Sequence, residues 1–558
     1  MALCGRKPRL LVVLSSGKTR VIWMPPLQLF RTCHGTKSRY WRIYWIPKLS
    51  RSPLLGRRRR FLRLNFGWNH PPLGCRLLNP RSLSMTQLES IYACLPEWLQ
   101  DIAVTAQGAL YCRQRFGAAF REEYALLKAT EKASALQLEL LQVSRLRRML
   151  THAAATVPYY QQRIPFAAIP ALRAGDWAAF QAIPVTEKAD LRQNPNAFLA
   201  GGRSPRGAIR WNTSGTTGTP IQLVYAPGSV SRQYAYVECY REQAGVTRFD
   251  RRAQFTGKMI APGEHNRRYW RYDWASRALM LSTVHLDETS IPHYLKAIQQ
   301  WRPRYLTGYP SAITLLAHHA LRDRRFPIEI PAILTSAETL MPEQRDLIES
   351  AFSGRVYDQY GQTEMQSFWF ECRYRRMHAH PLFGVTEILR PNGQPAPPGE
   401  TGDVVLTGLI NTAMPLIRYR IGDRAAWSGD DRCPCGRAMP MVEVIEGRRE
   451  DYLFSPQRGW VGRMDPALKG VSGVLECQFI QHRPNELQVL CVAAPDYSPL
   501  ARIQLEKNLL ERLGDQMRID FRLVQQIPRG ANGKFRTVVC YLDREPFPQS
   551  SGREVPSR

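Results

Sequence analysis

The chain has 558 residues, of which 44% are hydrophobic and 22% are charged, as is ordinary for a globular protein. Its 77 basic residues outnumber its 47 acidic ones, and the resulting net charge of +30 suggests a nucleic-acid or anionic-membrane partner. Twelve cysteines are too few for a disulfide scaffold. The sequence contains no run of 18 apolar residues, so it predicts no membrane-spanning helix.

The charge is concentrated in residues 1–84, which hold 18 Lys or Arg and no Asp or Glu. Without this prefix the net charge is +12. The prefix fits a transit peptide, a nucleic-acid-binding arm, a membrane tether, or a disordered or non-native segment before a true start at Met85. We favour the last interpretation, because the composition becomes ordinary from Met85 onward. A protein spanning Met85–Arg558 is therefore expected to be soluble and fully active.

Residues 89–151 predict helices. One helical face is indicated by apolar residues at spacings of 4, 3, 3 and 4, namely Leu136, Leu140, Val143, Leu146 and Leu150. Val157 and Pro158 should end this region, since the residue before a proline avoids the helical conformation.

Strand-like and helix-like segments alternate between residues 300 and 360. The predicted strands are Tyr305–Thr307, Ile333–Thr335 and Val356–Tyr357, and the predicted helices are Ser311–Arg322, with Ser311 as N-cap, and Pro342–Phe352. Such alternation predicts right-handed crossovers and a mostly parallel sheet. Ligands bind at the carboxyl ends of such strands, where Tyr309, Ser336–Glu338 and Tyr360–Glu364 fall.

A second pattern begins after Gly447. It predicts strands at Val474–Gln481, Leu487–Ala493 and Arg518–Gln526 and a helix at Ala501–Leu513. The predicted fold is therefore α/β, with a large multi-layer domain of mostly parallel sheets and flanking helices, and a small mobile α+β domain. We place the large domain at 85–447, with a helical start at 85–160, the small domain at 448–542, and a disordered tail at 543–558.

The most distinctive motif runs Thr213-Ser214-Gly215-Thr216-Thr217-Gly218-Thr219-Pro220. Its glycines free the backbone, and its hydroxyls beside exposed amides can surround phosphate oxygens. It is not a Walker loop, because no Gly-Lys-Ser/Thr follows.

Four further motifs follow in order along the chain. They are Tyr360-Gly361-Gln362-Thr363-Glu364, Arg418-Tyr419-Arg420-Ile421-Gly422-Asp423, Gly447-Arg448-Arg449-Glu450-Asp451 and Gly530-Ala531-Asn532-Gly533-Lys534. Taken singly, each also fits an ordinary polar turn. Taken together with the 213–220 motif, they resemble the adenylate-forming enzymes, which include acyl-CoA synthetases, firefly luciferase and non-ribosomal adenylation domains. The resemblance covers about 85–542 and is strongest to the phenylacetate–CoA ligase branch with its CapK-like members of capsular polysaccharide biosynthesis.

This resemblance implies roles for individual residues. The 213–220 loop and Thr363 would contact the phosphates, Tyr360 would lie near the adenine, and Asp423 would accept hydrogen bonds from the two ribose hydroxyls. Glu364 would hold Mg²⁺ beside the phosphates. Lys534 would screen the negative charge of the attacking carboxylate and the α-phosphate.

The remaining motif residues receive secondary roles by the same resemblance. Ser336 and Glu338, together with Tyr309, would line the adenine and acyl pockets. Gly361 and Arg448 would complete the nucleotide-binding set. The 447–451 motif would be the hinge on which the small domain rotates. Glu450 departs from the usual aspartate there, so Asp451 is the better candidate pivot, and a plain interdomain turn remains the alternative.

Cys433-Pro434-Cys435 forms a tight knuckle, and Cys372 lies upstream with His378 and His380. Three thiolates and one imidazole would make a tetrahedral zinc site, and phenylacetate–CoA ligase relatives often carry such a set. Spacing and resemblance favour His378 over His380. The site would be structural. The alternative is free thiols and a surface histidine.

The resemblance implies a two-step ligase that uses ATP, Mg²⁺ and coenzyme A. A small carboxylic acid would become an acyl-adenylate and then a thioester. One alternative is transfer of the acyl group to an amine or sugar acceptor, and another is a non-catalytic nucleotide-binding protein. We expect a cytoplasmic protein with no specific nucleic-acid partner and no membrane span, and a homodimer is left open.

Overall fold

A computed structural model defines two units, Met1–Leu77 and Leu78–Arg558. The residues that the structure describes are 10–15, 18–23, 91–165, 167–212, 221–262, 268–323, 326–430, 432–448, 452–461, 464–468, 470–530 and 534–542. In the first unit, β1 (Leu10–Ser15) and β2 (Lys18–Trp23) form an antiparallel hairpin. The rest of the prefix and the predicted tail lie outside the described residues. No helix among the described residues is long and apolar enough to cross a bilayer.

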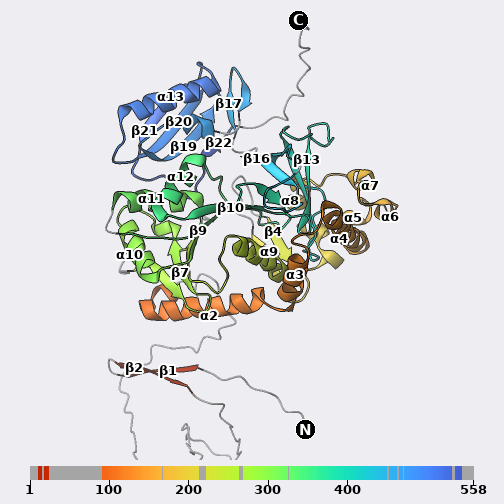
Figure 1. Cartoon of the computed structure of the whole chain (residues 1–558), viewed down its shortest axis with the longest axis horizontal. Helices are drawn as coiled ribbons and strands as arrows, with labels where there is room; N and C mark the ends of the chain where they lie inside the picture. Colours follow the sequence, from red (N-terminus) through yellow and green to blue (C-terminus); the bar gives the residue numbers. More distant parts are fainter. Residues whose placement is uncertain are drawn as a thin grey trace, which may run out of the picture. The chain divides into compact units, whose positions relative to one another are not determined.

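The second unit is built on one mixed sheet (Figure 1). Its strand order is β13-β14-β15-β16-β12-β11-β10-β9-β8-β5-β7-β6. The strands are β5 (Arg252–Thr256), β6 (Trp270–Asp273), β7 (Ala278–Ser282), β8 (Tyr305–Gly308), β9 (Ala332–Ser336), β10 (Arg355–Gly361), β11 (Phe368–Glu371), β12 (Met377–Ala379), β13 (Gly384–Leu389), β14 (Gly402–Gly408), β15 (Tyr419–Trp427) and β16 (Met441–Arg448).

The predicted α/β fold is confirmed, but the sheet is mixed rather than mostly parallel. β7, β5, β8, β9 and β10 pair in parallel, whereas the pairings from β10 through β11 to β13 and the β6–β7 pairing are antiparallel. The alternating strand and helix pattern of residues 300–360 has no counterpart beyond β10. There the described segments between consecutive strands contain no crossover helix, which favours antiparallel neighbours, and β12 pairs antiparallel with the distant β16.

Helices pack on both faces of the sheet. They are α2 (Glu97–Arg115), α3 (Ala118–Ala129), α4 (Ala135–Thr156), α9 (Ser229–Gln243), α10 (Ile291–Trp301), α11 (Pro310–Arg322) and α12 (Pro342–Phe352). Short helices α5 (Pro158–Gln161), α6 (Ala168–Ala171), α7 (Ala178–Gln181) and α8 (Lys188–Gln193) follow α4.

Successive residues of the parallel strands enter two different hydrophobic cores. Tyr305 and Tyr357 join the core that contains α4 and α9, while Leu306 and Val356 join the core that contains α10, α11 and α12. This follows from the two-residue period of a strand, which points neighbouring side chains to opposite faces. Strands buried on both faces explain the lack of polar alternation in their sequence.

The predicted N-cap of the helix after β8 is wrong by two residues. α11 begins at Pro310, and Tyr309 is its N-cap in an extended conformation. Proline fits the first helical position, because its fixed φ suits the helix and no N–H is lost there. Ser311 therefore lies inside the helix.

The predicted helix before Val157 is confirmed, since α4 ends at Thr156, but its buried face was predicted wrongly at the start. Leu136 and Leu140 are 61% and 53% exposed, whereas Leu146, Met149 and Ala153 are buried. A helix turns 100° per residue, so a stripe centred on these buried residues leaves Leu140 about 150° away.

The small domain is a four-stranded sheet of order β21-β20-β19-β22 with one helix (Figure 1). Its elements are β19 (Val474–Arg483), β20 (Glu486–Ala493), α13 (Pro499–Leu513), β21 (Arg518–Leu523) and β22 (Val538–Cys540), preceded by the hairpin of β17 (Leu453–Ser455) and β18 (Gly459–Val461). The predicted elements are confirmed, although β21 ends three residues before Gln526. Phe479, Val489 and Leu509 belong to a core of its own.

The corrected face of α4 gives a test of stability. Leu146→Ala should lower the free energy of unfolding by about 3 kcal/mol, because it leaves a cavity at a fully buried position. Leu140→Ala, the matched control on the exposed face, should change it by less than about 1 kcal/mol. Urea denaturation of both variants measures the difference, and equal losses would contradict the assigned face.

Candidate functional site

The parallel register brings three predicted loops to one edge of the sheet. Gly308 of β8 lies opposite Thr335 of β9, and Ser336 of β9 lies opposite Gln359 of β10. The last residues of these strands and the segments that follow them hold the predicted pocket residues and the 360–364 motif. The carboxyl edge of β8, β9 and β10 is thus the candidate site.

Two motif residues 63 positions apart meet in this region. Tyr360 donates a hydrogen bond from its hydroxyl to the Asp423 carboxylate, and its ring stacks on Trp369 at 4.2 Å. Asp423 lies on β15, with 8% of its surface exposed. The fold therefore joins the predicted adenine-side residue to the predicted ribose-binding residue.

Glu364 is a buried carboxylate, and Tyr225 and Tyr419 lie close to it. Burial, followed by the negative charge of Glu364, raises the pKa of both tyrosine hydroxyls. The Tyr225 hydroxyl donates to the Thr363 carbonyl. The buried Tyr419 hydroxyl has no hydrogen-bond partner among the residues that the structure describes.

Tyr225 also connects the 360–364 motif to the flank of the predicted phosphate loop. It ends β4 (Gln222–Tyr225), which pairs antiparallel with β3 (Ile209–Asn212). These strands flank residues 213–220, which lie outside the described residues. The flank of that motif and Thr363 therefore lie next to each other.

The small domain reaches the same edge through the lysine motif. The backbone N–H of Phe535, directly after Lys534, donates to the Glu338 carboxylate at 2.7 Å. Gly530 donates its N–H to the Lys534 carbonyl at 3.0 Å. Ala531, Asn532 and Gly533 lie outside the described residues.

The hinge motif begins beside the predicted ribose-binding residue. Arg448 ends β16, where its backbone is the register partner of Asp423 on β15. The Arg448 side chain and residues 449–451, which include the predicted pivot, lie outside the described part of the chain.

Arg418, the first residue of the 418–423 motif, makes contacts that hold neighbouring segments together. It is buried, and its guanidinium forms a two-point ion pair with Glu387 at 2.9 and 3.0 Å and donates to the carbonyls of Gln181 and Ile183. Arg418 thus ties β13 to the end of α7 and to the residues that follow it.

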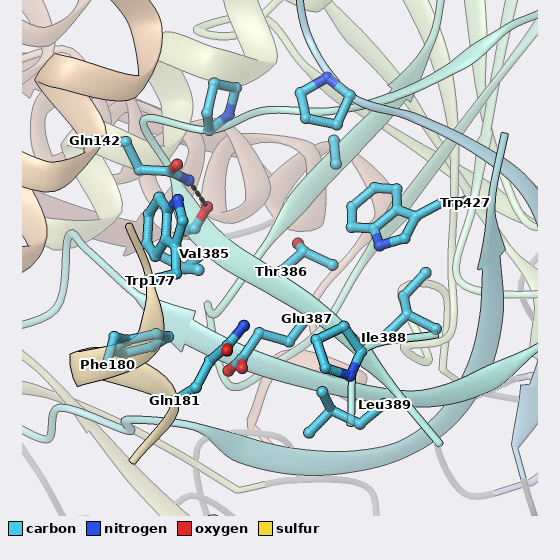
Figure 2. A pocket seen from close by; sticks show the side chains of 15 residues that line it. Gln142, Trp177, Phe180, Gln181, Val385, Thr386, Glu387, Ile388, Leu389 and Trp427 are labelled. Carbon is cyan, nitrogen blue, oxygen red and sulfur yellow. Dashed lines mark hydrogen bonds between the residues drawn. The ribbon is translucent and has the colours of Figure 1, made fainter. Parts of the chain in front are cut away.

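A cavity of about 220 Å³ lies beside this ion pair. Trp177 and Phe180 lie on one side of Thr386 and Trp427 on the other, and Gln142 donates to the Gly384 carbonyl at 3.1 Å (Figure 2). None of the predicted nucleotide-binding residues lines this cavity, so it is separate from the candidate site.

Four predicted metal ligands come together at a third place. The donor atoms of Cys372, His378, Cys433 and Cys435 all lie within 4.8 Å of one another. The Cys372 and Cys433 sulfurs are 3.6 Å apart, and the Cys435 sulfur is 3.4 Å from Nε2 of His378. Zn–S bonds of 2.3 Å at tetrahedral angles would place two sulfurs about 3.8 Å apart, so the set fits a tetrahedral ion.

The surroundings of the two histidines separate their roles. Nδ1 of His378 lies 3.4 Å from the Met439 carbonyl, which would orient the ring with Nε2 toward the sulfurs. His380 instead packs against the Tyr236 ring, and its Nδ1 accepts the Leu382 N–H. The geometry therefore favours His378, as the sequence predicted.

Three residues of this region were not predicted from the sequence, namely Tyr225, Tyr419 and Arg529, whose guanidinium lies 3.4 Å from the Ser311 hydroxyl. Tyr419 lies inside the 418–423 motif, and Arg529 directly precedes the 530–534 motif, so their positions in the sequence could have indicated both residues. Tyr225 carries no such signal, because only the fold brings β4 against Thr363.

The large α/β domain has its candidate site at the carboxyl ends of parallel strands, and the small domain brings a lysine loop to that site. This arrangement is that of the adenylate-forming enzymes. Residues 211–414 match the family model described as AMP-binding enzyme, and residues 453–540 match the one described as CapK C-terminal domain. The chain belongs to the AMP-binding, adenylate-forming superfamily. It is an adenylate-forming enzyme, and the family implies use of ATP and a small acyl substrate.

The comparisons also place the chain near two groups of relatives. It is 26% identical to Protein CapK of Staphylococcus aureus over 459 residues, which cover 81% of this chain and 99% of that protein. It is 26% identical to phenylacetate–coenzyme A ligase of Thermus thermophilus over 340 residues, covering 57% and 72% of the two chains. The structure of a 2-hydroxyisobutyryl-CoA ligase in the postadenylation state has the same fold, with a TM-score of 0.57, 21% identity and coverage of 74% and 91%.

The strand that carries Tyr360 also contains an acid with a strongly shifted pKa. Burial, followed by the negative charge of Glu371, raises the pKa of Asp358 to about 6, although Thr335 donates a hydrogen bond to it at 2.7 Å. The folded protein thus holds a proton that the unfolded chain releases near pH 4. The stabilisation from this proton is complete below about pH 4 and is lost as the pH rises through about 6.

Asp358→Asn should therefore gain stability relative to the wild type by on the order of 2 kcal/mol between pH 4 and pH 7. Urea unfolding at several pH values measures this gain. Asp346→Asn, which changes an exposed acid in α12, should show no such trend. If the difference in free energy of unfolding between Asp358→Asn and the wild type did not vary with pH, the raised pKa of Asp358 would be refuted.

Proposed function

We propose that the protein is an ATP-dependent carboxylate ligase that forms an acyl-adenylate and then an acyl-CoA thioester. The observation that carries this proposal is the meeting of distant motifs at one edge of the sheet. Tyr360 bonds Asp423 there, and the residue after Lys534 bonds Glu338. The similarity to phenylacetate–coenzyme A ligases supports a thioester product.

In the first step, a carboxylate oxygen of the substrate attacks the α-phosphorus of ATP, and pyrophosphate leaves. Asp423 would accept hydrogen bonds from the ribose hydroxyls, which requires Tyr360 to share or release that carboxylate. Lys534 would stabilise the charge that develops between the carboxylate and the α-phosphate. In the second step, a thiol attacks the acyl carbonyl, and AMP leaves.

Glu364 is the candidate Mg²⁺ ligand. Its carboxylate is buried, and the hydroxyl of its buried neighbour Tyr419 has no hydrogen-bond partner among the described residues, so the residues present suit a polar ligand. Mg²⁺ bound here would neutralise charge on the phosphates. Thr363 and the 213–220 motif would contact the same phosphates.

A second acceptor class is favoured by one observation. The similarity to Protein CapK extends over 99% of that protein, whereas the similarity to the Thermus thermophilus ligase covers 72%. An adenylate-forming enzyme of the CapK group that passes its acyl group to an amine or sugar would share the first step. It would differ only in the second nucleophile.

Carboxylate-dependent exchange of pyrophosphate into ATP tests the first step. Over a panel of small acids, the full chain should show exchange with at least one acid. Lys534→Ala should reduce that exchange by about a hundredfold or more, because charge stabilisation at the transition state is lost. Lys507→Ala, at an exposed position of α13, is the matched control and should retain full exchange. Absence of exchange with every acid would overturn the proposal.

The acceptor is tested by the product. With the acid identified in the exchange assay, mass spectrometry should detect a CoA thioester when coenzyme A is supplied. Formation of an amide or sugar ester, with no thioester, would instead establish the second acceptor class.

We also propose that Cys372, His378, Cys433 and Cys435 bind a structural zinc ion. Bound there, zinc would tie the β11–β12 turn to the segment before β16. The purified chain should contain about one zinc, and Cys435→Ser should reduce that content below about half and lower the melting temperature. Cys94→Ser, at an exposed cysteine outside the cluster, is the control. A wild-type zinc content below about half an equivalent would contradict a closed four-ligand site.

A further inference from the structure

The Glu338 carboxylate joins the two domains by bridging two backbone amides. One oxygen accepts the Phe535 N–H of the small domain at 2.7 Å, and the other accepts the Ser311 N–H of α11 at 3.1 Å. Hydrogen bonds to an ionised acceptor are stronger than neutral ones. Glu338 therefore holds the backbone of the lysine loop at the Phe535 amide.

Arg529 supports this contact from the small domain. Its guanidinium pairs with Glu476 of β19, and one nitrogen lies 3.4 Å from the Ser311 hydroxyl. The same guanidinium lies 4.8 Å from the centre of the Phe535 ring. Arg529 and Glu338 thus meet at Ser311, and between them they hold both the amide and the ring of Phe535.

This arrangement determines where the backbone of Lys534 lies. The peptide group between Lys534 and Phe535 is held through both of its polar atoms, because the Lys534 carbonyl accepts the Gly530 N–H and the Phe535 N–H donates to Glu338. A misplacement of about 1 Å can reduce a reaction by orders of magnitude, so a loop that carries a catalytic group needs such anchoring.

We infer that Glu338 is a positioning residue that sets Lys534 for the adenylation step and has no part in the step that follows. The inference rests on the proposed function, and it replaces the predicted role of Glu338 as a lining residue of the adenine and acyl pockets. If the small domain rotates between the steps, the Glu338–Phe535 bond breaks. Loss of the carboxylate should then affect only the first half-reaction.

The two half-reactions are measured separately with the full chain. Glu338→Ala should slow pyrophosphate exchange by about tenfold or more at saturating ATP, with little change in the KM for ATP. The same variant, supplied with preformed acyl-adenylate and coenzyme A, should form thioester within about twofold of the wild-type rate. Glu338→Gln keeps one acceptor oxygen, so it should recover part of the exchange rate.

Two controls separate positioning from stability. Glu329→Ala removes an exposed acid of the large domain and should leave both rates and the melting temperature unchanged. Ser311→Ala keeps the backbone N–H that Glu338 accepts but removes the hydroxyl, which interacts with both Glu338 and Arg529, so it should have a smaller effect than Glu338→Ala.

A readout that does not need the acyl substrate is hydrogen exchange of the Phe535 amide, followed by mass spectrometry. Exchange should be faster in Glu338→Ala than in the wild type, with the melting temperature preserved. Unchanged Phe535 exchange, unchanged pyrophosphate exchange, or equal loss of both half-reactions would each overturn the inference. A wild type without carboxylate-dependent exchange would overturn the proposed function, while the amide measurement would still test the Glu338–Phe535 bond.

Discussion

The parallel pairing of β8, β9 and β10 is the constraint on which the rest of the site depends. Each strand is buried on both faces, so its side chains are committed to two cores and cannot shift register without exposing them. The chain can carry polar chemistry only where it leaves the sheet. Because parallel strands end at the same edge, the segments after Gly308, Ser336 and Gly361 must lie together.

The contact between the two domains is of a different kind. The small domain closes its own hydrophobic core, which includes Phe479 and Leu509, and it meets the large domain through Leu475 and the polar groups around Glu338. When polar groups separate, water replaces their hydrogen bonds, whereas apolar side chains exposed to water lose the free energy of burial. Such a contact would let the small domain move as a body without unfolding, as interfaces between domains generally permit.

The sequence predicted most where periodicity and motifs agreed. The strands and helices from 305 to 357 were predicted in the right order because apolar runs, proline and helix lengths all indicate the same elements, although the N-cap of α11 is Tyr309 rather than Ser311. Leu136 and Leu140 show where this reasoning ends. Apolar residues at helical spacing define a face, but only the packed neighbours decide how far that face extends.

The candidate site was predicted in its members but not in its contacts. Cysteine and histidine are recognisable in a sequence as metal ligands, and the fold brings four of them together, namely Cys372, His378, Cys433 and Cys435. The bonds from Tyr360 to Asp423 and from Phe535 to Glu338 join residues 63 and 197 positions apart. No local pattern encodes such a pair, because it depends on how separate elements pack. A sequence motif cannot identify a backbone donor such as the Phe535 amide, because every residue except proline has a backbone N–H.

The register of β15 and β16 links nucleotide binding to domain motion. Asp423 and the backbone of Arg448 are partners in adjacent strands, so the last described residue of the large domain is held by the strand that carries the predicted ribose ligand. A rotation that begins after Arg448 would leave Asp423 and Tyr360 in place while it carries Lys534 away. The nucleotide could then stay bound through both steps while the group needed only for the first is withdrawn. Conversely, a change at Arg448 that disturbed this pairing would affect ribose binding and rotation together, although the two functions belong to different motifs.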